Sequence, residues 1–275
     1  MARTISILNK LAQEKGENPN RLKAIFALER IVARLESDPR LSQSLVYKGG
    51  YVLYKTTDTN RLTRDVDALA HGLSPEEAGK LTIEALAINL FDDIYYHDPK
   101  TLELETTGEY GGLRVDVAYS INEAVIKPEK VKKLSRVHFD IGFGSFLPDE
   151  KEKESMKLVL DKAGLEVSWS VLPLEYIFAE KLQTLIIRGD QNSRGKDIYD
   201  MWFISEKLTD LPLLKNAINR VFKDRNTEVP VNFTKHVSGL NFAILRSSWK
   251  AILFSETSTT FDEAMAGLME FLKKI

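Results

Sequence analysis

The fold of this chain is decided by two nearby stretches, Lys48-Gly49-Gly50-Tyr51-Val52-Leu53 and Arg61-Leu62-Thr63-Arg64-Asp65-Val66-Asp67-Ala68-Leu69-Ala70. The Gly pair is expected to open a short helix, and a polar turn then leads to an apolar strand. Side chains at positions i and i+2 of a strand point to the same face, so Asp65 and Asp67 should converge there. The two stretches therefore predict a helix start followed by a pair of neighbouring carboxylates.

These residue types suit the binding of a phosphate that carries a metal ion. Mg²⁺ usually takes one or two protein carboxylates together with phosphate oxygens of the substrate. A Gly-Gly pair at a helix N-terminus presents backbone N–H groups and the positive end of the helix dipole to an anion. Each feature alone is also typical of an ordinary surface strand or a tight turn. Together they predict a phosphoryl or nucleotidyl transfer site.

The composition narrows the class of protein. The chain has 275 residues, and 38 Lys and Arg against 40 Asp and Glu leave a net charge of -2, which excludes a globally basic nucleic-acid-binding surface. The absence of cysteine excludes disulfides, thiolate zinc sites and Cys nucleophiles. No run approaches the roughly 18 apolar residues of a membrane span, and the start has no apolar signal core. We therefore expect a soluble, intracellular protein without a membrane partner.

The region before residue 172 predicts both helices and strands. Apolar spacing and cap or turn residues predict helices over 6–15, 21–35, 51–56 and 75–90. Apolar runs and alternation predict strands over 66–70, 101–106, 113–119 and 137–144, in a mixed or antiparallel sheet, and a charged surface segment over 149–161. Asp116 and Asp140 lie on the polar phase of their strands, so either could supply a third acid beside the pair.

The rest of the chain is helical in pattern. Helices are predicted over 174–187 and from 196, and helical spacing recurs at about 211–222, 240–254 and 261–272. Lys181 lies on the first of these helices, where it could simply extend past the core, and Asp197 could serve the helix dipole. We predict an α/β (α+β) fold with an N-terminal α/β domain over 1–172 and a C-terminal helical domain over 173–275.

The order of four motifs resembles a known family, the AbiEii-type nucleotidyltransferase toxins of type IV toxin–antitoxin systems. This family includes MenT-like tRNA nucleotidyltransferase toxins and belongs to the DNA polymerase β-like superfamily. The resemblance rests on the opening stretches, on Phe139-Asp140-Ile141-Gly142-Phe143-Gly144, on Glu175…Ala179-Glu180-Lys181-Leu182-Gln183…Arg188, and on Asn192-Ser193-Arg194-Gly195-Lys196-Asp197-Ile198-Tyr199-Asp200-Met201-Trp202. It implies a polymerase β-like core with a mixed sheet, followed by a helical bundle.

The resemblance also implies residue roles. Asp65 and Asp67 would hold Mg²⁺, with Asp140 as a third ligand and Asp116 as the alternative. Lys181 would neutralise charge on the triphosphate, and Asp197 would orient Lys181 or help to activate the acceptor hydroxyl. The nucleotide would further be bound by Lys48, Gly49, Gly50, Thr63, Arg194 and Lys196. The active site would thus draw on both halves of the chain.

The implied reaction transfers a nucleoside monophosphate from an NTP (CTP, UTP or GTP) to the 3′ acceptor end of tRNA, which blocks translation in the cytoplasm. A cognate antitoxin would be the protein partner. Basic residues over 127–136, and Arg220, Lys223 and Arg225, are candidate tRNA contacts, although each cluster alone is also typical of a solvated surface. Two alternatives stay open: transfer to a protein or small-molecule hydroxyl, and a non-catalytic nucleotide-binding module that acts through a partner.

Overall fold

The structure is a computed structural model of the chain, and it describes residues 3–63, 65–104, 111–144, 151–161, 164–252, 254 and 259–275. Its internal contacts divide the chain into two compact units. The first, here the sheet unit, comprises Met1–Thr57 and Thr63–Val171, and the second, the helical unit, comprises Asp58–Leu62 and Leu172–Ile275. The predicted domains over 1–172 and 173–275 stay a prediction. Residues 58–62, which we expected in the first domain, pack with the helical unit.

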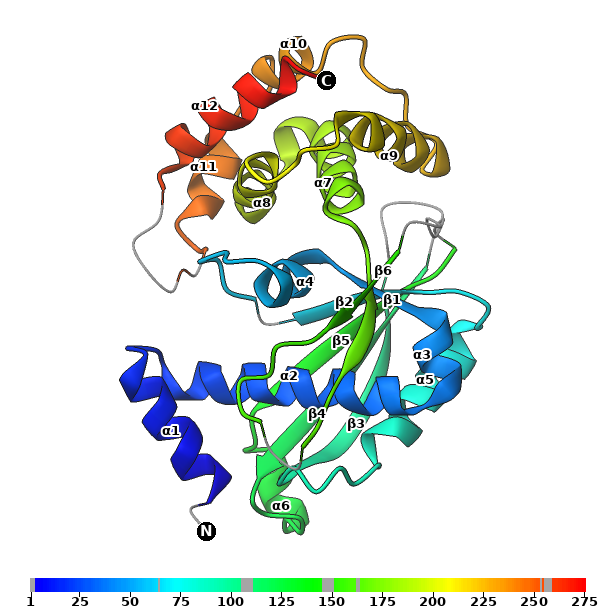
Figure 1. Cartoon of the computed structure of the whole chain (residues 1–275), viewed down its shortest axis with the longest axis vertical. Helices are drawn as coiled ribbons and strands as arrows, with labels where there is room; N and C mark the ends of the chain where they lie inside the picture. Colours follow the sequence, from blue (N-terminus) through cyan, green and yellow to red (C-terminus); the bar gives the residue numbers. More distant parts are fainter. Residues whose placement is uncertain are drawn as a thin grey trace. The chain divides into compact units, whose positions relative to one another are not determined.

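In its described residues, the sheet unit contains one mixed seven-stranded sheet, which confirms the predicted fold class (Figure 1). The strands are β1 (Leu45–Lys48), β2 (Asp65–Ala70), β3 (Ile94–Leu104), β4 (Gly112–Ile121), β5 (Arg136–Gly142), β6 (Glu152–Ser155) and β7 (Ser168–Val171). Their order is β3-β4-β5-β2-β1-β7-β6. The pairs β2–β5 and β1–β7 are parallel and the other pairs are antiparallel.

The helices of the sheet unit start both with and without a side-chain cap. They are α1 (Thr4–Glu14), α2 (Pro19–Ser37), α3 (Pro39–Ser44), α4 (Gly49–Thr56), α5 (Pro75–Leu86) and α6 (Pro128–Val131). The Asn18 side chain accepts hydrogen bonds from two backbone N–H groups at the start of α2. Ser74 and Glu77 form a reciprocal capping box at the start of α5. The cap at Ser74 was part of the prediction for 75–90, whereas the helix over 21–35 was predicted from its apolar spacing and begins two residues earlier than expected.

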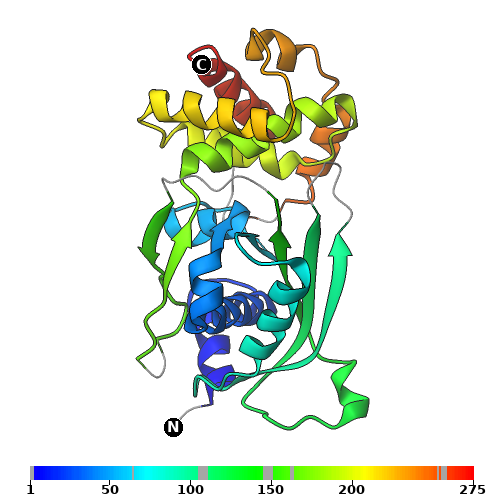
Figure 2. The same ribbon diagram turned by 90° about the vertical axis from the view of Figure 1, so that its right-hand side faces the viewer.

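One face of the sheet is apolar and is covered by α2 and α5 (Figures 1 and 2). Tyr47, Ala68, Ile141 and Leu113 lie in register across four neighbouring strands, and all four are buried. A Cβ added to Gly79 of α5 would lie 2.9 Å from Leu113 Cδ2, so this helix packs directly on the apolar face. The core therefore lies between the sheet and these helices, and the opposite face of the strands carries polar side chains together with buried apolar ones such as Leu69.

The helical unit is built from α7 (Leu174–Arg188), the 3₁₀ turn η1 (Gly189–Gln191), α8 (Gly195–Ser205), α9 (Leu211–Asp224), α10 (Phe233–Ser238), α11 (Ala243–Trp249) and α12 (Phe261–Leu272) (Figure 1). Helix α7 packs against α8 and α9, and α8 packs against α11 and α12. The rings of Phe178 and Phe271 pack edge to face, with their centroids 5.5 Å apart. In the described part of the chain, no helix is long and apolar enough to span a membrane.

Several elements differ from the sequence-based predictions for physical reasons. Strand β3 begins at Ile94 and not at 101 as predicted. The first part of the strand was missed because Pro99 and a register shift between His97 and Lys100 interrupt its alternation of apolar and polar residues. Strand β6 lies in the segment expected to be a charged surface segment; it is exposed, and among the described residues it pairs with β7 alone. Strands β1 and β7 were not predicted, because with four residues each they are too short to show a recognisable alternation of apolar and polar residues. The helix predicted over 75–90 ends at Leu86, and the spacing over 240–254 gives only the seven-residue α11.

Parts of some predictions concern residues outside the described ranges. These are 105–106 of one predicted strand, 149–150 of the charged segment, 253 of the last but one helix, and Arg64 of the opening motif.

Candidate active site

Two rows of polar side chains cross the face of the sheet opposite α2 and α5. In the first row, Lys48, Asp67, Asp140 and Arg114 lie in register on β1, β2, β5 and β4. The second row contains Asp65, His138 and Asp116 on β2, β5 and β4. Residues in register on neighbouring strands share a face, so the structure brings the predicted acids to one surface.

The Asp67 carboxylate lies against the start of α4. Gly49 has a φ of +72°, which an L side chain rarely adopts, and a Cβ built there would lie 2.8 Å from Asp67 Oδ2. The glycine is therefore required both by its backbone conformation and by the room that the carboxylate takes. Gly50 follows it within the first turn of α4, and Lys48 directly precedes the helix.

Asp65 is oriented from the loop before its strand. The Thr63 hydroxyl donates a hydrogen bond of 2.6 Å to Asp65 Oδ1. Thr63 itself is buried, whereas Asp65 and Asp67 are half-buried. The two carboxylates thus present oxygen ligands on one face, which is the donor type that Mg²⁺ prefers.

Asp140 lies beside Asp67, but both of its carboxylate oxygens are bound by Arg114. Arg114 Nε donates to Oδ1 at 2.8 Å and Nη2 donates to Oδ2 at 2.7 Å. Among the residues that the structure describes, no three His, Asp or Glu side chains are grouped closely enough to hold a metal ion. The predicted third ligand is therefore near the pair without joining it in a common cluster.

Asp116, the alternative third acid, has its own cation. Arg136 Nε donates to Asp116 Oδ2 at 2.5 Å, and the same guanidinium reaches Asp98. Asp116 is one strand further from Asp65 than His138 is. By position Asp140 is the better candidate, because it pairs directly with Asp67.

A second cluster of charges lies in the helical unit around Lys181 of α7. Lys181 Nζ lies 2.9 Å from Asp197 Oδ1 and 2.8 Å from Asp200 Oδ2, and its side chain is buried. Arg194 Nε donates to Asp197 Oδ2 at 2.5 Å. Arg61 binds Asp200 with two nitrogens, Nε at 2.5 Å and Nη2 at 3.0 Å. Three cations thus alternate with two carboxylates.

The start of α8 is held so that both aspartates face Lys181. Gly195 has no room for a side chain, because a Cβ would lie 2.7 Å from Ser248 Oγ and 2.9 Å from the carbonyl oxygen of Leu245 in α11. Its N–H donates to the Ser248 hydroxyl at 2.9 Å. Asp197 and Asp200 then fall on one face of the helix at the i, i+3 spacing.

These contacts shift the acid–base properties of the cluster. Burial alone would lower the pKa of Lys181, but Asp197 and Asp200 outweigh it and raise the pKa, so the ammonium stays charged. Burial alone would raise the pKa of Asp197, but Lys181 and Arg194 together hold that pKa well below its usual range. A carboxylate with a depressed pKa and a cation on each oxygen is a weak base. The geometry therefore favours an orienting role for Asp197.

Arg61 and Asp200 have no role among the residues predicted from the sequence. Both are buried, and their two-pronged contact joins the opening motif to α8 within the helical unit. A recognisable signal was the second acid three residues after Asp197. Lys196, a predicted nucleotide contact, is half-buried at the start of α8.

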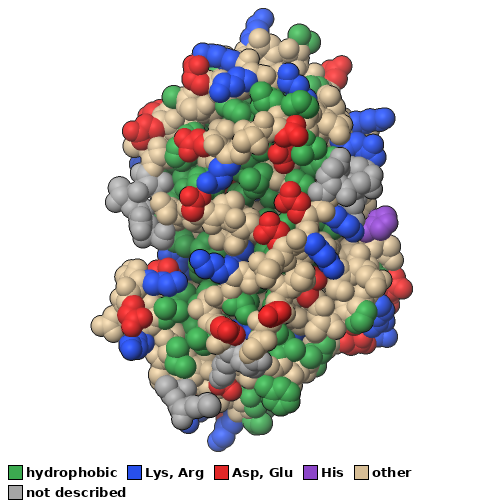
Figure 3. All heavy atoms as spheres, in the orientation of Figure 1, with side chains coloured by type: hydrophobic (Ala, Val, Ile, Leu, Met, Phe, Trp, Pro, Cys, Tyr) green, Lys and Arg blue, Asp and Glu red, His purple; other side chains and the backbone are tan. Residues whose placement is uncertain are grey.

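The candidate RNA contacts differ in their availability. Arg225 donates to Glu180 at 2.7 Å and to Gln183 at 2.9 Å, so its charge is already used within the helical unit. Lys130, Lys132 and Lys133, in and just after α6, are exposed in the sheet unit. Figure 3 shows Lys and Arg side chains interspersed with Asp and Glu on the surface, in agreement with the near-neutral net charge.

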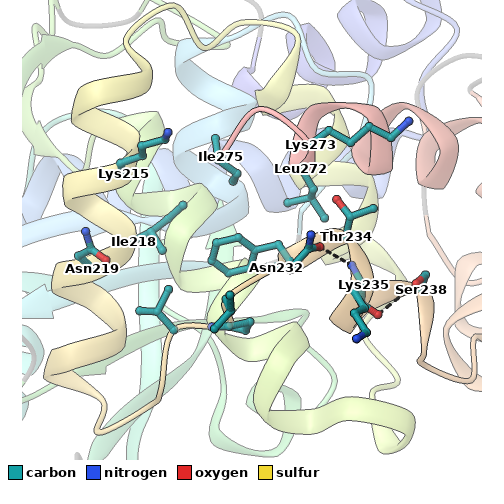
Figure 4. Close-up of a pocket in the computed structure, with 14 residues that line it drawn as sticks. Lys215, Ile218, Asn219, Asn232, Thr234, Lys235, Ser238, Leu272, Lys273 and Ile275 are labelled. Atoms are coloured by element: carbon teal, nitrogen blue, oxygen red, sulfur yellow. Dashed lines mark hydrogen bonds between the residues drawn. The ribbon is translucent and has the colours of Figure 1, made fainter.

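A pocket of about 740 Å³ lies elsewhere in the helical unit, between α9, α10 and the end of α12 (Figure 4). Its lining combines three lysines, Lys215, Lys235 and Lys273, with apolar side chains. It contains none of the predicted site residues.

Comparisons with known proteins identify the family and the fold. A family model described as nucleotidyl transferase AbiEii toxin, type IV TA system, matches residues 30–267. The chain belongs to the AbiEii family. It is therefore a nucleotidyltransferase of the toxin–antitoxin type, and both the family resemblance and the enzyme class predicted from the sequence are confirmed. A nucleotide substrate and an antitoxin partner follow from the same membership.

Solved structures share the fold of this AbiEii protein. MenT4, a nucleotidyltransferase toxin from Mycobacterium tuberculosis H37Rv, is 16% identical with a TM-score of 0.56, over 100% of this chain and 91% of that one. JHP933 from Helicobacter pylori is 16% identical with a TM-score of 0.52, over 93% and 90% of the two chains. No curated protein sequence matches the chain significantly.

Proposed function

We propose that this AbiEii protein transfers a nucleoside monophosphate from CTP, UTP or GTP to the 3′ acceptor end of tRNA in the cytoplasm and thereby blocks translation. One observation carries the transfer chemistry: Asp65 and Asp67 face the same side of β2, with Asp67 packed against the glycine that starts α4. The tRNA acceptor is supported by the resemblance to MenT-like toxins.

Asp65 and Asp67 are the proposed ligands of Mg²⁺. Their half-buried carboxylate oxygens suit a hard cation, and the hydrogen bond from Thr63 holds one of them in place. When bound, the ion would neutralise charge on the triphosphate and polarise the phosphate under attack. Lys48 and the backbone N–H groups of Gly49 and Gly50 would bind phosphate oxygens at the start of α4.

Lys181 is the proposed cation for the charge that develops on the leaving pyrophosphate. Asp197 and Asp200 keep it protonated and fix its position, which favours electrostatic stabilisation without rearrangement at the moment of reaction. Arg194 and Lys196 would add phosphate or acceptor contacts. The acceptor hydroxyl oxygen forms a bond to the α-phosphorus, the bond from that phosphorus to the β-phosphate oxygen breaks, pyrophosphate leaves, and the hydroxyl proton passes to solvent.

The decisive experiment incubates the full chain with Mg²⁺, total tRNA and each α-labelled NTP in turn. We expect label in the tRNA band, and loss of that label after RNase but not after protease treatment. Label that survives RNase and is lost with protease would support a protein acceptor instead. No label in any macromolecule would refute transfer to tRNA.

Two variants connect the reaction to the clusters. Asp67→Asn and Lys181→Met should each lower transfer by a factor of about 100 or more, since they remove a metal ligand and a phosphate-neutralising cation. Lys215→Met, at the pocket of the helical unit, is the control and should leave the rate unchanged. Wild-type activity in either of the first two variants would refute the assigned site.

A further inference from the structure

We propose that Asp140 is not a metal ligand but the anchor of Arg114, and that Arg114 binds a phosphate oxyanion of a substrate at this face of the sheet. The proposal rests on the proposed function, because it concerns the same site. It differs from the role that the family resemblance implies for Asp140.

The pair is built across two strands. Asp140 of β5 and Arg114 of β4 lie in register, and the guanidinium contacts both carboxylate oxygens at 2.7 and 2.8 Å. Such a two-pronged contact fixes the plane and direction of the guanidinium, which a single hydrogen bond does not. The Asp140 side chain is 16% exposed, whereas that of Arg114 is 34% exposed, so the arginine is the more accessible partner.

The arrangement argues against a third carboxylate on the metal. With a guanidinium across both oxygens, the negative charge of Asp140 is already balanced, and a divalent cation placed there would meet a positive neighbour. Among the described side chains, no group of three possible ligands forms around Asp65 and Asp67. Two carboxylates plus phosphate oxygens satisfy the usual needs of Mg²⁺.

Arg114 lies within the electrostatic range of the metal-binding pair. The pKa of its guanidinium is raised, first by the hydrogen bonds from Arg114 to Asp140 and also by the charges of Asp65 and Asp67. Only Nε and Nη2 bind Asp140, so Nη1 and the second N–H of Nη2 are left to donate elsewhere. Phosphate oxygens are the acceptors that match such a fork. They could belong to the NTP or to the RNA acceptor.

The first arm of the test measures metal binding alone. Mn²⁺ binding to the full chain is followed by electron paramagnetic resonance for the wild type, Asp67→Asn and Asp140→Asn. We expect Asp67→Asn to weaken binding more than tenfold and Asp140→Asn to change it less than twofold. A loss with Asp140→Asn as large as that with Asp67→Asn would overturn the proposal. An unchanged affinity in Asp67→Asn would instead refute the metal site of the proposed function.

The second arm uses inorganic triphosphate with Mn²⁺, and separately total tRNA without nucleotide. Arg114→Met should weaken the binding of one of the two ligands about tenfold, and the ligand affected identifies the source of the phosphate. Asp140→Asn should weaken the binding of the same ligand. The variant with both substitutions should bind this ligand no more weakly than Arg114→Met does, because both substitutions disrupt the same Arg114–Asp140 pair. Arg246→Met, which breaks the exposed two-pronged pair with Asp262, is the matched control.

A third variant separates binding from folding. Arg114→Lys keeps the charge but cannot make the fork, so we expect wild-type thermal stability within a few degrees together with weakened ligand binding. If Arg114→Met and Arg114→Lys bind both ligands as the wild type does, the proposal is wrong.

Discussion

Replacing Gly49 with alanine is the sharpest single test of how the Asp65–Asp67 pair is positioned. A Cβ at this residue would lie 2.8 Å from Asp67 Oδ2 and 3.5 Å from its Cγ. To restore an ordinary contact of 3.4 Å, the carboxylate oxygen must move by about 0.6 Å. The φ of +72° adds a backbone cost of roughly 1–2 kcal/mol for any residue with a Cβ.

Gly72→Ala is the matched control for the backbone cost. Gly72 has a φ of +71°, but nothing lies within 4 Å of the Cβ that would be added. Both variants should therefore lose roughly 1–2 kcal/mol of unfolding free energy, measured by urea denaturation. Any further loss in Gly49→Ala reports the contact with Asp67.

The two variants should differ far more in activity. Displacement of a catalytic group by an ångström costs on the order of 100-fold in rate, so Gly49→Ala should lose between about 10- and 100-fold in labelled NMP transfer. Gly72→Ala should transfer at the wild-type rate under conditions where it is folded. Equal rates of transfer in the two variants would refute this reasoning, because the contact between residue 49 and Asp67 would then have no effect on the reaction.

Three further predictions address charge, pH and metal. Asp200→Asn should lower the unfolding free energy by about 3 kcal/mol in urea, because Arg61 and Lys181 both lose a buried partner; a change under 1 kcal/mol would contradict this. Burial raises the pKa of Glu36 to about 7, above the 4.5 of an unfolded chain, so stability should fall as pH rises from 4.5 to 7. Glu36→Gln should remove that fall and raise the free energy of unfolding at pH 8 by up to about 3 kcal/mol, an upper bound because solvent screens a partly exposed side chain. EDTA should abolish transfer and excess Mg²⁺ restore it; full activity in EDTA would exclude a metal requirement.

The carboxylate pair could be read from the sequence because its spacing is local. Period two on a strand places Asp65 and Asp67 on one face whatever the strand pairs with. The Gly pair was also predictable as a helix start, and anion binding or a tight turn were the reasons apparent for Gly49. The structure adds a steric reason, because its missing Cβ makes room for the Asp67 carboxylate.

The Arg114–Asp140 pair could not be read in the same way. The two residues are 26 apart, and they meet only because β4 and β5 pair antiparallel in one particular register. A slip of one residue would turn either side chain to the apolar face. That register depends on buried side chains such as Leu113 and Ile141, which the sequence identifies as apolar without saying which ones face each other.

The opening motif also hides a division that its sequence does not reveal. Arg61 and Asp65 are four residues apart and look like parts of one loop and strand. By its contacts, however, Arg61 belongs to the helical unit, where it holds Asp200, whereas Asp65 belongs to the sheet unit. Asp200 in turn holds Lys181. A change at Arg61 should therefore disturb the Lys181 cluster and leave Mn²⁺ binding by the aspartates intact, although the motif reads as a single metal-binding element.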